Sequence, residues 1–490
     1  MKKNTFLIVL FSITLLGCIL RFWNYSERFG LAYDQAHDAI VAREALKEGK
    51  IPLVGPFSSA GPFQTSGTWY WLLMVPTVIC RYSVVSPWIF LTALYGLLII
   101  GMGMLGKRME NGFFGLLLAG LTALSTAQIA QSVNLTNQTP IPIFSFLTIV
   151  CAIWYMKKKT LLSAFGMGFF AGFGASIHLQ GMSLGIPVLM AFILGGKTKI
   201  RFLLIALFGA LLPMLPIVLW DTSNEFVNIK NMIYYYRFDQ FNISLDVLGR
   251  RWLTYLSEFW PKEWAHIIGG LPQIAILIAV LAVGFFVLQI IRKKMNTSWL
   301  FIFLSFGFMT VLVRYTRVPI YSSFITFTHP FIILITAWVL YRVYCIKRHL
   351  GIALIFVVFV FTMMKTGNEV FSEHINLTAR ASKEVRSMLT QMYPGETFAF
   401  YDWKYEEAPR SVPIVLYMDE KNLLSDEGRA IGFTRRRTQD GLLAPIISTA
   451  SGTIADLSAS SSARLVEEQW IRINPSSIYA WTEEWRQLVQ

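Results

Sequence analysis

The chain has 490 residues, of which 54% are hydrophobic and 15% charged, with a formal net charge of +14. This composition indicates a polytopic membrane protein. The basic residues fall in short gaps between apolar runs rather than in an aromatic-interleaved patch, which excludes a nucleic-acid-binding function as the reason for the charge.

Eleven apolar runs divide the chain, each near the ~20 residues with which a helix crosses a bilayer. In chain order they cover residues 6–23, 86–106, 113–130, 139–156, 160–178, 182–196, 200–220, 268–291, 298–313, 320–341 and 349–365. The sequence therefore predicts an all-α membrane domain over residues 1–365 with about eleven transmembrane helices.

Lysine and arginine occur in alternate gaps between these runs. The basic gaps contain Lys2 and Lys3, Lys107 and Arg108, Lys157, Lys158 and Lys159, Lys197, Lys199 and Arg201, Arg292, Lys293 and Lys294, and Arg342, Lys347 and Arg348. The short gaps around 131–138 and 179–181 contain none. By the positive-inside rule we expect a multi-pass plasma-membrane protein with a cytoplasmic N-terminus. The polar stretches 24–85, 221–267 and 366–490 then lie outside.

The N-terminus has a basic start, an apolar run and a Leu-Leu-Gly-Cys ending at Cys18, like a lipoprotein cleavage site. The apolar run continues to Trp23, so an uncleaved first span is the default prediction and lipoprotein processing the alternative. The remaining cysteines, in or beside apolar segments, are Cys80, Cys151 and Cys345. Their positions predict neither a disulfide framework nor a cysteine metal site.

The first polar stretch carries two carboxylates one helical turn apart, Asp34 and Asp38. A short amphipathic helix is predicted after them, ending at Gly49, where a glycine C-cap belongs. Asp34 has two interpretations: a helix N-cap, worth about 1 kcal/mol, and a general base. Asp38, a first-turn acid on the same face, could support a base. The later run Trp69-Tyr70-Trp71 is typical of a membrane–water boundary.

Polar residues beside later spans are candidates for substrate contacts. Asn134 and Asn137 precede the fourth span, and His178 and Gln180 follow the fifth. Amides here either cap helices or donate to a polar substrate. A lone histidine is more often a hydrogen-bonded structural residue than a ligand. No His-x-x-x-His or acidic cluster predicts a zinc site.

Arginines in the loops predicted to lie outside require a specific interaction to explain them, because positive charge is normally concentrated on the cytoplasmic side. Arg314 and Arg317 flank the turn before the 320–341 span, and the 221–267 loop contains Arg237, Arg250 and Arg251. They either pair with loop acids or lipid headgroups, or hold the phosphate of a lipid-linked substrate, which suits a guanidinium. Arg314 and Arg317 are predicted to be exposed.

Residues 366–490 lack the long apolar runs of the preceding residues. Residues 377–393 show helical periodicity and stop at Pro394-Gly395, and a strand-like segment follows at 397–403. Short apolar runs separated by Ser, Gly and Asp complete the chain. The sequence predicts a small α/β domain on the exterior face.

These features resemble the GT-C membrane glycosyltransferases, and within them the bacterial protein O-mannosyltransferase-like and aminoarabinose-transferase-like enzymes. The resemblance covers residues 1–365. The residues that carry it are Tyr33-Asp34-Gln35 with Asp38, Gly55-Pro56, Gly61, Gly67 through Tyr70, Asn134, Asn137, His178-Leu179-Gln180, Leu212-Pro213 and Trp220-Asp221. The chain departs from many relatives at Gln35, where they have Glu, so the pattern does not support a metal held there.

The resemblance implies transfer of a hexosyl or pentosyl sugar from a polyprenyl-phosphate donor to a protein, lipid or glycan acceptor at the cell envelope. Asp34 would be the catalytic base and Asp38 its support. The lipid-linked sugar donor is the small molecule that the resemblance implies. A divalent metal stays open as an alternative that the sequence does not support, and no metal ligand is assigned. Expected substrate contacts are Tyr33, Gln35, Gln64, Tyr70, Asn134, Asn137, His178, Gln180, Arg314 and Arg317.

Two other classes stay open. A transporter or flippase of a lipid-linked saccharide would place ionisable or broken-helix sites near the midplane. The runs 86–106, 113–130 and 268–291 contain no Asp, Glu, Lys or Arg, which disfavours this class. A non-catalytic subunit for cell-envelope assembly would use the same loops for binding, and activity with an isolated lipid-linked sugar would distinguish it.

Overall fold

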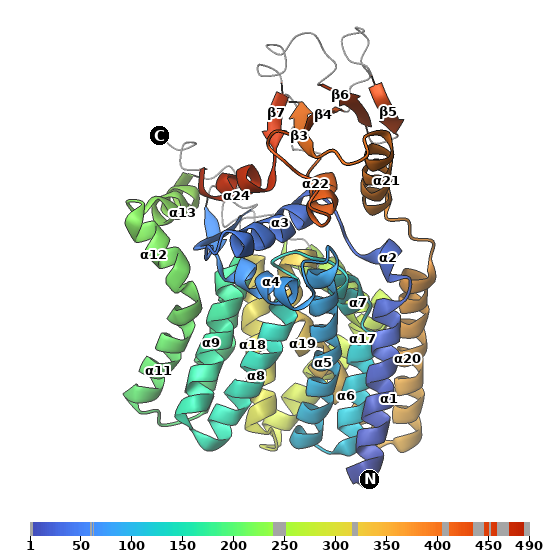
Figure 1. The fold of residues 1–490 in the computed structure, drawn as a ribbon. Helices are drawn as coiled ribbons and strands as arrows, with labels where there is room; N and C mark the ends of the chain where they lie inside the picture. The colour runs from blue at the N-terminus through green and yellow to red at the C-terminus, as the bar shows by residue number, and fades with distance from the viewer. Residues whose placement is uncertain are drawn as a thin grey trace.

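The computed structural model describes residues 3–58, 61, 63–238, 251–315, 322–403, 411–434, 445–449, 452–457 and 470–484. Long apolar helices form a bundle, and a smaller layer of helices and strands covers one end of it (Figure 1). We call this the domain end of the bundle. The N-terminus lies at the opposite end, which we call the N-terminal end (Figure 1).

The eleven predicted spans all fall on apolar helices, so the predicted fold class is confirmed. In the described residues, eight helical segments are long and apolar enough to cross a membrane: α1 (Lys3–Phe22), α5 (Ser86–Met109), α8 (Ile141–Lys158), α11–η2–α12 (Ile200–Ser223), α17 (Pro272–Ile291), α18 (Thr297–Arg314), η4–α19 (Ser322–Ile346) and α20 (Arg348–Phe371). The pair α6 (Gly112–Leu124) and α7 (Thr126–Ser132) forms a ninth, bent by 56°. The shorter apolar helices α9 (Leu161–Ile177) and η1–α10 (Leu179–Leu194) match the other two predicted spans.

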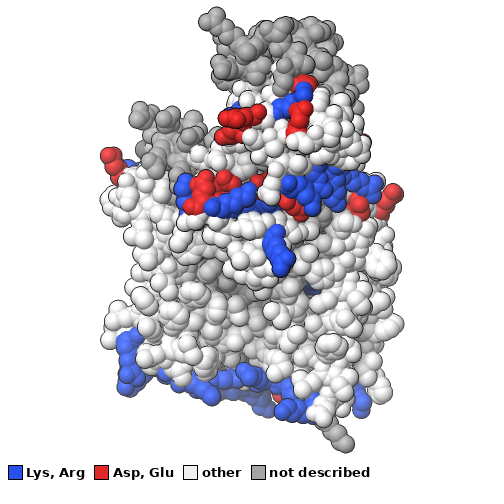
Figure 2. Space-filling model, in the orientation of Figure 1, with Lys and Arg blue, Asp and Glu red and all other residues white. Residues whose placement is uncertain are grey.

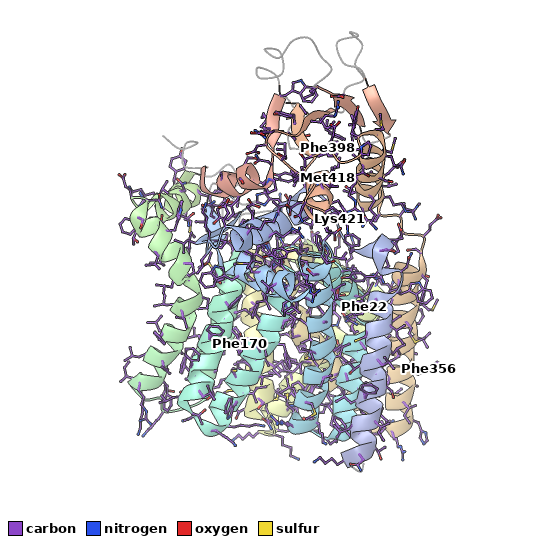
Figure 3. The ribbon with its side chains drawn as sticks, viewed as in Figure 1. Phe22, Phe170, Phe356, Phe398, Met418 and Lys421 are labelled. Carbon is purple, nitrogen blue, oxygen red and sulfur yellow. The ribbon has the colours of Figure 1, made fainter. Side chains whose placement is uncertain are left out.

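The outward surface of the bundle is apolar, as a bilayer requires. Phe356 on α20 points away from its neighbours and is 67% exposed (Figure 3). Helix α19, by contrast, is surrounded by other helices and almost wholly buried. The bundle therefore has a protein-filled centre and a lipid-facing rim.

Arg21 fixes the bend between α6 and α7. Its buried guanidinium donates to the carbonyls of Thr122 (3.2 Å) and Ala123 (3.0 Å), in the last turn of α6. Thr366 on α20 donates to the next carbonyl, that of Leu124, at 2.6 Å. These donors satisfy carbonyls that the end of a helix leaves unpaired. The loop after α7 consequently leaves the bundle in a fixed direction.

The first polar stretch forms α2 (Tyr25–Arg28), α3 (Tyr33–Lys47), an antiparallel hairpin of β1 (Val54–Phe57) and β2 (Gln64–Ser66), and α4 (Thr68–Ile79). Helix α3 lies across the domain end, above α4 (Figure 1). It ends as predicted, because Gly49 adopts a left-handed φ of 64° that glycine tolerates. The second polar stretch forms α13 (Val227–Phe238), α15 (Trp252–Thr254), the π-helical turn η3 (Tyr255–Phe259) and α16 (Trp260–Ile267).

The C-terminal residues build the predicted α/β layer. Its five-stranded sheet has the order β5-β6-β4-β3-β7, in which only β3 and β4 are parallel. The strands are β3 (Phe398–Trp403), β4 (Arg429–Thr434), β5 (Pro445–Thr449), β6 (Gly452–Asp456) and β7 (Trp470–Ile473), and the helices are α21 (Leu377–Met392), α22 (Val412–Asp419) and α24 (Pro475–Glu484). Phe398 and Met418 lie in its core (Figure 3). Helices α22 and α24 pack on α3.

Charged side chains separate along the bundle axis. Figure 2 shows mainly Lys and Arg at the N-terminal end, acids and bases together at the domain end, and a broad band between them that is almost free of charge. Loops with excess positive charge stay in the cytoplasm. This distribution favours a cytoplasmic N-terminal end.

We expect the domain end to face away from the cytoplasm. A reporter that is active only outside the cytoplasm, fused after Gln490, should be active, because the eleven spans predicted from the sequence place residues 366–490 on the side opposite the N-terminus. The same reporter inserted after Lys158, in the basic gap between α8 and α9, is the control and should be silent. The reverse pattern of reporter activity would contradict the proposed orientation.

Candidate functional site

Asp34 does not cap α3, so the N-cap interpretation is wrong. The helix begins at Tyr33, Ala32 is its N-cap, and Asp34 is its second residue. The backbone N–H of Ala32 instead donates to Oε1 of Gln35 at 3.0 Å, as a side chain at the third helical position can reach back to do. Asp34 makes no hydrogen bond or ion pair with any described residue.

The Asp34 side chain is exposed, yet its carboxyl lies against the protein. Restricted hydration raises the pKa of Asp34, the nearby Asp38 carboxylate raises it further, and His37 opposes them. A raised pKa strengthens a carboxylate as a proton acceptor. Asp34 is therefore a carboxylate with a raised pKa and no hydrogen-bond or ion-pair partner among the described residues.

Asp38 has the opposite environment. It is only 5% exposed and receives three side-chain contacts. Trp69 Nε1 donates to Oδ2 at 2.7 Å, Tyr70 OH donates to Oδ1 at 3.3 Å, and His37 Nδ1 lies 3.2 Å from Oδ1. A buried carboxylate is stable only with such partners. Asp38 thus joins α3 to α4 and sets the rotation of the helix that carries Asp34.

Of the aromatic run Trp69-Tyr70-Trp71, only one residue is exposed at the surface. Trp69 and Tyr70 are fully buried under α3, where Asp38 binds both. Only Trp71, 37% exposed, faces outward. The hydroxyl of Tyr70 therefore supports Asp38, and its contact with substrate stays a prediction.

Tyr33 and Gln35 flank Asp34 along the chain. Burial, with Asp34 adding its charge, raises the pKa of Tyr33 to about 12, so its hydroxyl remains a donor. Gln35 Nε2 donates to Oδ1 of Asn134 at 3.3 Å, which ties α3 to the loop after α7. Asn134 Oδ1 also accepts from the Leu135 N–H at 2.8 Å. Gln35 and Asn134 thus connect two segments that are far apart in sequence.

Asn137 and His178 make similar connections. Asn137 Nδ2 donates to the Ile177 carbonyl at 2.8 Å, at the end of α9. His178 Nε2 lies 3.1 Å from Nε2 of Gln138, and its Nδ1 accepts from the Gln180 N–H at 3.2 Å. These hydrogen bonds favour the structural interpretation of both residues, while their contact with substrate stays a prediction.

Gln180 joins the short helices η1 and η4. Its amide donates to the Ser323 carbonyl at 3.0 Å and accepts from both the N–H and the hydroxyl of Thr326, each at 3.1 Å. Gln64 is fixed through its backbone, since its N–H donates to Oδ1 of Asn228 at 2.7 Å and its carbonyl accepts from Nδ2 at 3.3 Å. Both glutamines are buried, and each joins two segments that are far apart in sequence.

Arg314 is not exposed, contrary to the prediction. It ends α18 and is 3% exposed, with its guanidinium carbon 5.8 Å from the ring centres of both Trp252 and Tyr255. Its Nε and Nη2 atoms are buried and have no hydrogen-bond partner among the described residues. A guanidinium with unused donors is able to bind an anion. Arg317 and Arg250 lie outside the described residues.

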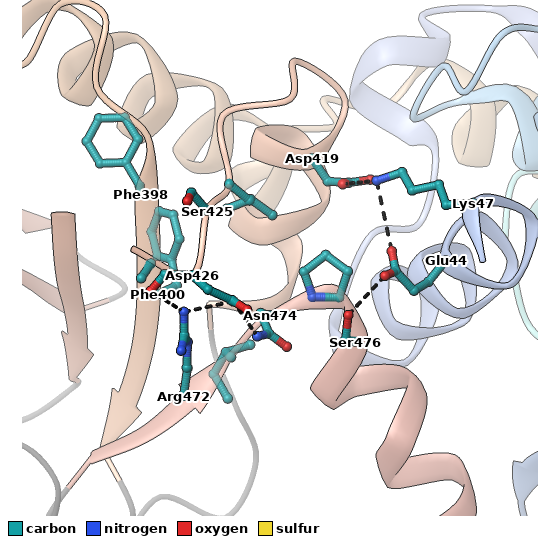
Figure 4. A pocket seen from close by; sticks show the side chains of 14 residues that line it. Glu44, Lys47, Phe398, Phe400, Asp419, Ser425, Asp426, Arg472, Asn474 and Ser476 are labelled. Atoms are coloured by element: carbon teal, nitrogen blue, oxygen red, sulfur yellow. Dashed lines mark hydrogen bonds and ion pairs between the residues drawn. The ribbon is translucent and has the colours of Figure 1, made fainter. Parts of the chain in front are cut away.

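A cluster of charges, not singled out in the sequence, joins α3 to the C-terminal layer. Arg43 Nε donates to Oδ2 of Asp419 at 2.8 Å with both side chains buried, and Lys47 pairs with Oδ1. Ser476 on α24 donates to Glu44 at 3.0 Å. Figure 4 shows Glu44, Lys47, Asp419 and Ser476 along a cavity of about 240 Å³ between α3 and the sheet. We call this set of contacts the α3 junction.

The described residues contain no group of three or more His, Cys, Asp or Glu side chains that could hold a metal ion. The Gln35 amide is already engaged by Ala32 and Asn134. The arrangement supports acid–base chemistry at Asp34.

No protein-family model matches the sequence, and no curated protein matches it significantly. Solved structures do. ArnT from Cupriavidus metallidurans in the apo state has a TM-score of 0.60 at 12% identity, covering 92% of this chain and 98% of that chain. ArnT bound to undecaprenyl phosphate has a TM-score of 0.59 at 12% identity, covering 95% and 99%.

The oligosaccharyltransferase AglB from Archaeoglobus fulgidus, in complex with an inhibitory peptide and a dolichol-phosphate, has a TM-score of 0.51 at 12% identity. The match covers 86% of this chain and 64% of AglB. At these identities the likeness shows the fold. The chain has the GT-C fold that the sequence resemblance predicted.

The α3 junction should be a major contribution to stability. Replacing Asp419 with Asn leaves the buried Arg43 without its counter-ion, which typically costs about 3 kcal/mol. We expect a clearly lower melting temperature in detergent for Asp419→Asn. Asp426→Asn is the control, because Asp426 borders the same cavity but is exposed, and the loss of its exposed ion pair with Arg472 should cost less than about 1 kcal/mol. Equal melting temperatures for the two variants would contradict a structural role for Asp419.

Proposed function

We propose that the protein is an integral-membrane glycosyltransferase that moves a sugar from a polyprenyl-phosphate donor to an acceptor on the extracytoplasmic face. The observation that carries the proposal is the free, exposed carboxylate of Asp34 beside the buried Asp38. The shared fold adds support, since ArnT was solved with undecaprenyl phosphate and AglB with a dolichol-phosphate.

The reaction is a single displacement. The acceptor hydroxyl loses its proton to the Asp34 carboxylate as its oxygen attacks the anomeric carbon of the sugar. The bond between that carbon and the phosphate oxygen breaks, and the polyprenyl phosphate leaves with the electron pair. Asp38 does not receive the proton, because its oxygens are already occupied by Trp69, Tyr70 and His37. Its role is to hold α3 in place.

Arg314 is the residue that we assign to the donor phosphate. Its unpaired Nε and Nη2 atoms offer two donors in a fixed geometry that suits phosphate oxygens. Charge building up on the leaving phosphate would strengthen these bonds in the transition state. The rings of Trp252 and Tyr255 hold the guanidinium in this orientation.

The two units of the chain would divide this work. The membrane domain, residues 1–365, holds Asp34 and Arg314, and the extracytoplasmic domain, residues 366–490, supports α3 through the α3 junction. A transporter or flippase is disfavoured because these two unpaired groups lie in α3 and at the last residue of α18, at the domain end, rather than near a midplane. The acceptor is a protein, lipid or glycan hydroxyl.

Asp34→Asn should abolish most transfer while the protein stays folded. The exposed side chain has no partner to lose, so the melting profile should be normal, but an amide cannot take a proton, and activity should fall by roughly 100-fold or more. The measurement is transfer from a polyprenyl-phosphate sugar by the purified variant. Glu48→Gln, which removes a carboxylate just beyond the other end of α3, is the matched control and should retain activity.

The pH dependence of the wild-type protein gives a second readout. Because the pKa of Asp34 is raised, activity should decline on acidification at a pH above the ordinary Asp value of about 4. Asp38→Asn removes the neighbouring negative charge and should move this decline to lower pH. Near-normal turnover by Asp34→Asn would leave the chain without its proposed base.

Arg314 should affect use of the donor more than the protein fold. We compare Arg314→Met, which keeps much of the volume between Trp252 and Tyr255, with Arg314→Ala, which leaves a cavity. Both should raise the KM for the donor, and the alanine variant should also melt at a lower temperature. A methionine variant with unchanged donor kinetics would show that Arg314 serves packing alone.

A further inference from the structure

In the part of the chain that the structure describes, helix α13 is held by its first turn and by Tyr235. Its first backbone N–H groups are capped by Asp221, whose carboxylate accepts from Asn228 at 2.7 Å and from Ile229 at 3.2 Å. The side chain of Asn228 in turn binds the backbone of Gln64 in β2. Tyr235 packs against Phe63 with ring centres 5.5 Å apart. Asn228 therefore marks the inward direction of the helix.

The opposite side of α13 combines cationic and apolar residues. At 100° per residue, positions 230, 233 and 237 point within about 40° of the direction opposite Asn228. All are exposed, and Ile233 is 49% exposed. We call this side, with its two flanking residues, the outer face of α13: Ile229, Lys230, Ile233, Tyr234 and Arg237.

The two cations on this face are not neutralised by the surrounding protein. Helix α13 contains no Asp or Glu, and in the part of the chain that the structure describes neither Lys230 nor Arg237 is in an ion pair. Figure 1 places α13 at the domain end of α12, where that membrane-spanning segment finishes. This is the depth at which the headgroups of a bilayer begin.

Neither water alone nor acyl chains alone suits such a face. A helix in water exposes polar residues, whereas Ile229, Ile233 and Tyr234 are about half exposed. A helix among acyl chains excludes lysine and arginine. Apolar, tyrosine and cationic residues together are typical of a helix lying in the membrane interface.

We propose that the outer face of α13 binds anionic phospholipid headgroups in the leaflet at the domain end. Lys230 and Arg237 would pair with the headgroup phosphates, and the isoleucines would enter the acyl boundary. Binding there would steady the hairpin of β1 and β2 through Asn228 and Tyr235. The inference does not depend on the proposed glycosyl transfer.

The test uses the full chain in nanodiscs of phosphatidylcholine, with or without one third phosphatidylglycerol, and measures hydrogen exchange of residues 227–238. We expect several-fold slower exchange with phosphatidylglycerol, because each cation at an anionic surface strengthens binding. The double variant Lys230→Gln/Arg237→Gln should lose this difference. Lys383→Gln/Lys421→Gln, which removes two exposed charges from the C-terminal layer, should keep it.

Three outcomes would overturn the proposal. The first is exchange that does not respond to phosphatidylglycerol in the wild-type protein. The second is a response that persists in Lys230→Gln/Arg237→Gln. The third is slower exchange of residues 227–238 in phosphatidylcholine nanodiscs only when a polyprenyl phosphate is added. That result would mean that the outer face of α13 binds the donor rather than phospholipid headgroups. The variants change exposed side chains, so normal melting profiles are expected throughout.

Discussion

The placement of α3 depends on buried carboxylates with complete sets of partners. The helix lies between the membrane bundle and a water-facing domain, so lipid cannot cover either of its sides. Asp38 binds Trp69 and Tyr70 below it, and Asp419 binds Arg43 and Lys47 above it. Burying a charge is costly unless its partners are correctly placed, and such contacts therefore specify one geometry more strictly than apolar packing does. Asp34 is positioned by these neighbours and takes part in none of their hydrogen bonds.

The elements of the fold were predictable because their signals are local. Apolar length and alternating positive charge identified the membrane helices, and Gly49 marked the end of α3. The break after Leu124 was not predictable, and residues 113–130 looked like one continuous span. Its cause is partly remote, since Arg21 in α1 and Thr366 in α20 satisfy the carbonyls exposed at the bend.

The candidate site was only partly predictable. Spacing along one helix identified Asp34 and Asp38, but the division of roles between them depends on the burial of Asp38 by α4. Arg43 and Asp419 are 376 residues apart, and no local pattern relates them. Arg314 was expected at the surface, but it is buried by two aromatic rings, those of Trp252 in α15 and Tyr255 in η3. These rings are more than fifty residues away in sequence, so no pattern around Arg314 indicates them.

The α3 junction also limits which C-terminal domains can be combined with this membrane domain. The C-terminal layer supplies the only described counter-ion of Arg43, and Glu420 beside Asp419 accepts from the N–H of Val84 in the turn before α5. A C-terminal domain taken from another protein would have to place acceptors opposite Arg43, Lys47 and the N–H of Val84. A domain without acceptors at these places would leave the buried Arg43 unpaired. Homologous recombination within such genes should therefore succeed mainly when the segment encoding α3 and the segment encoding α22 are inherited from the same parent.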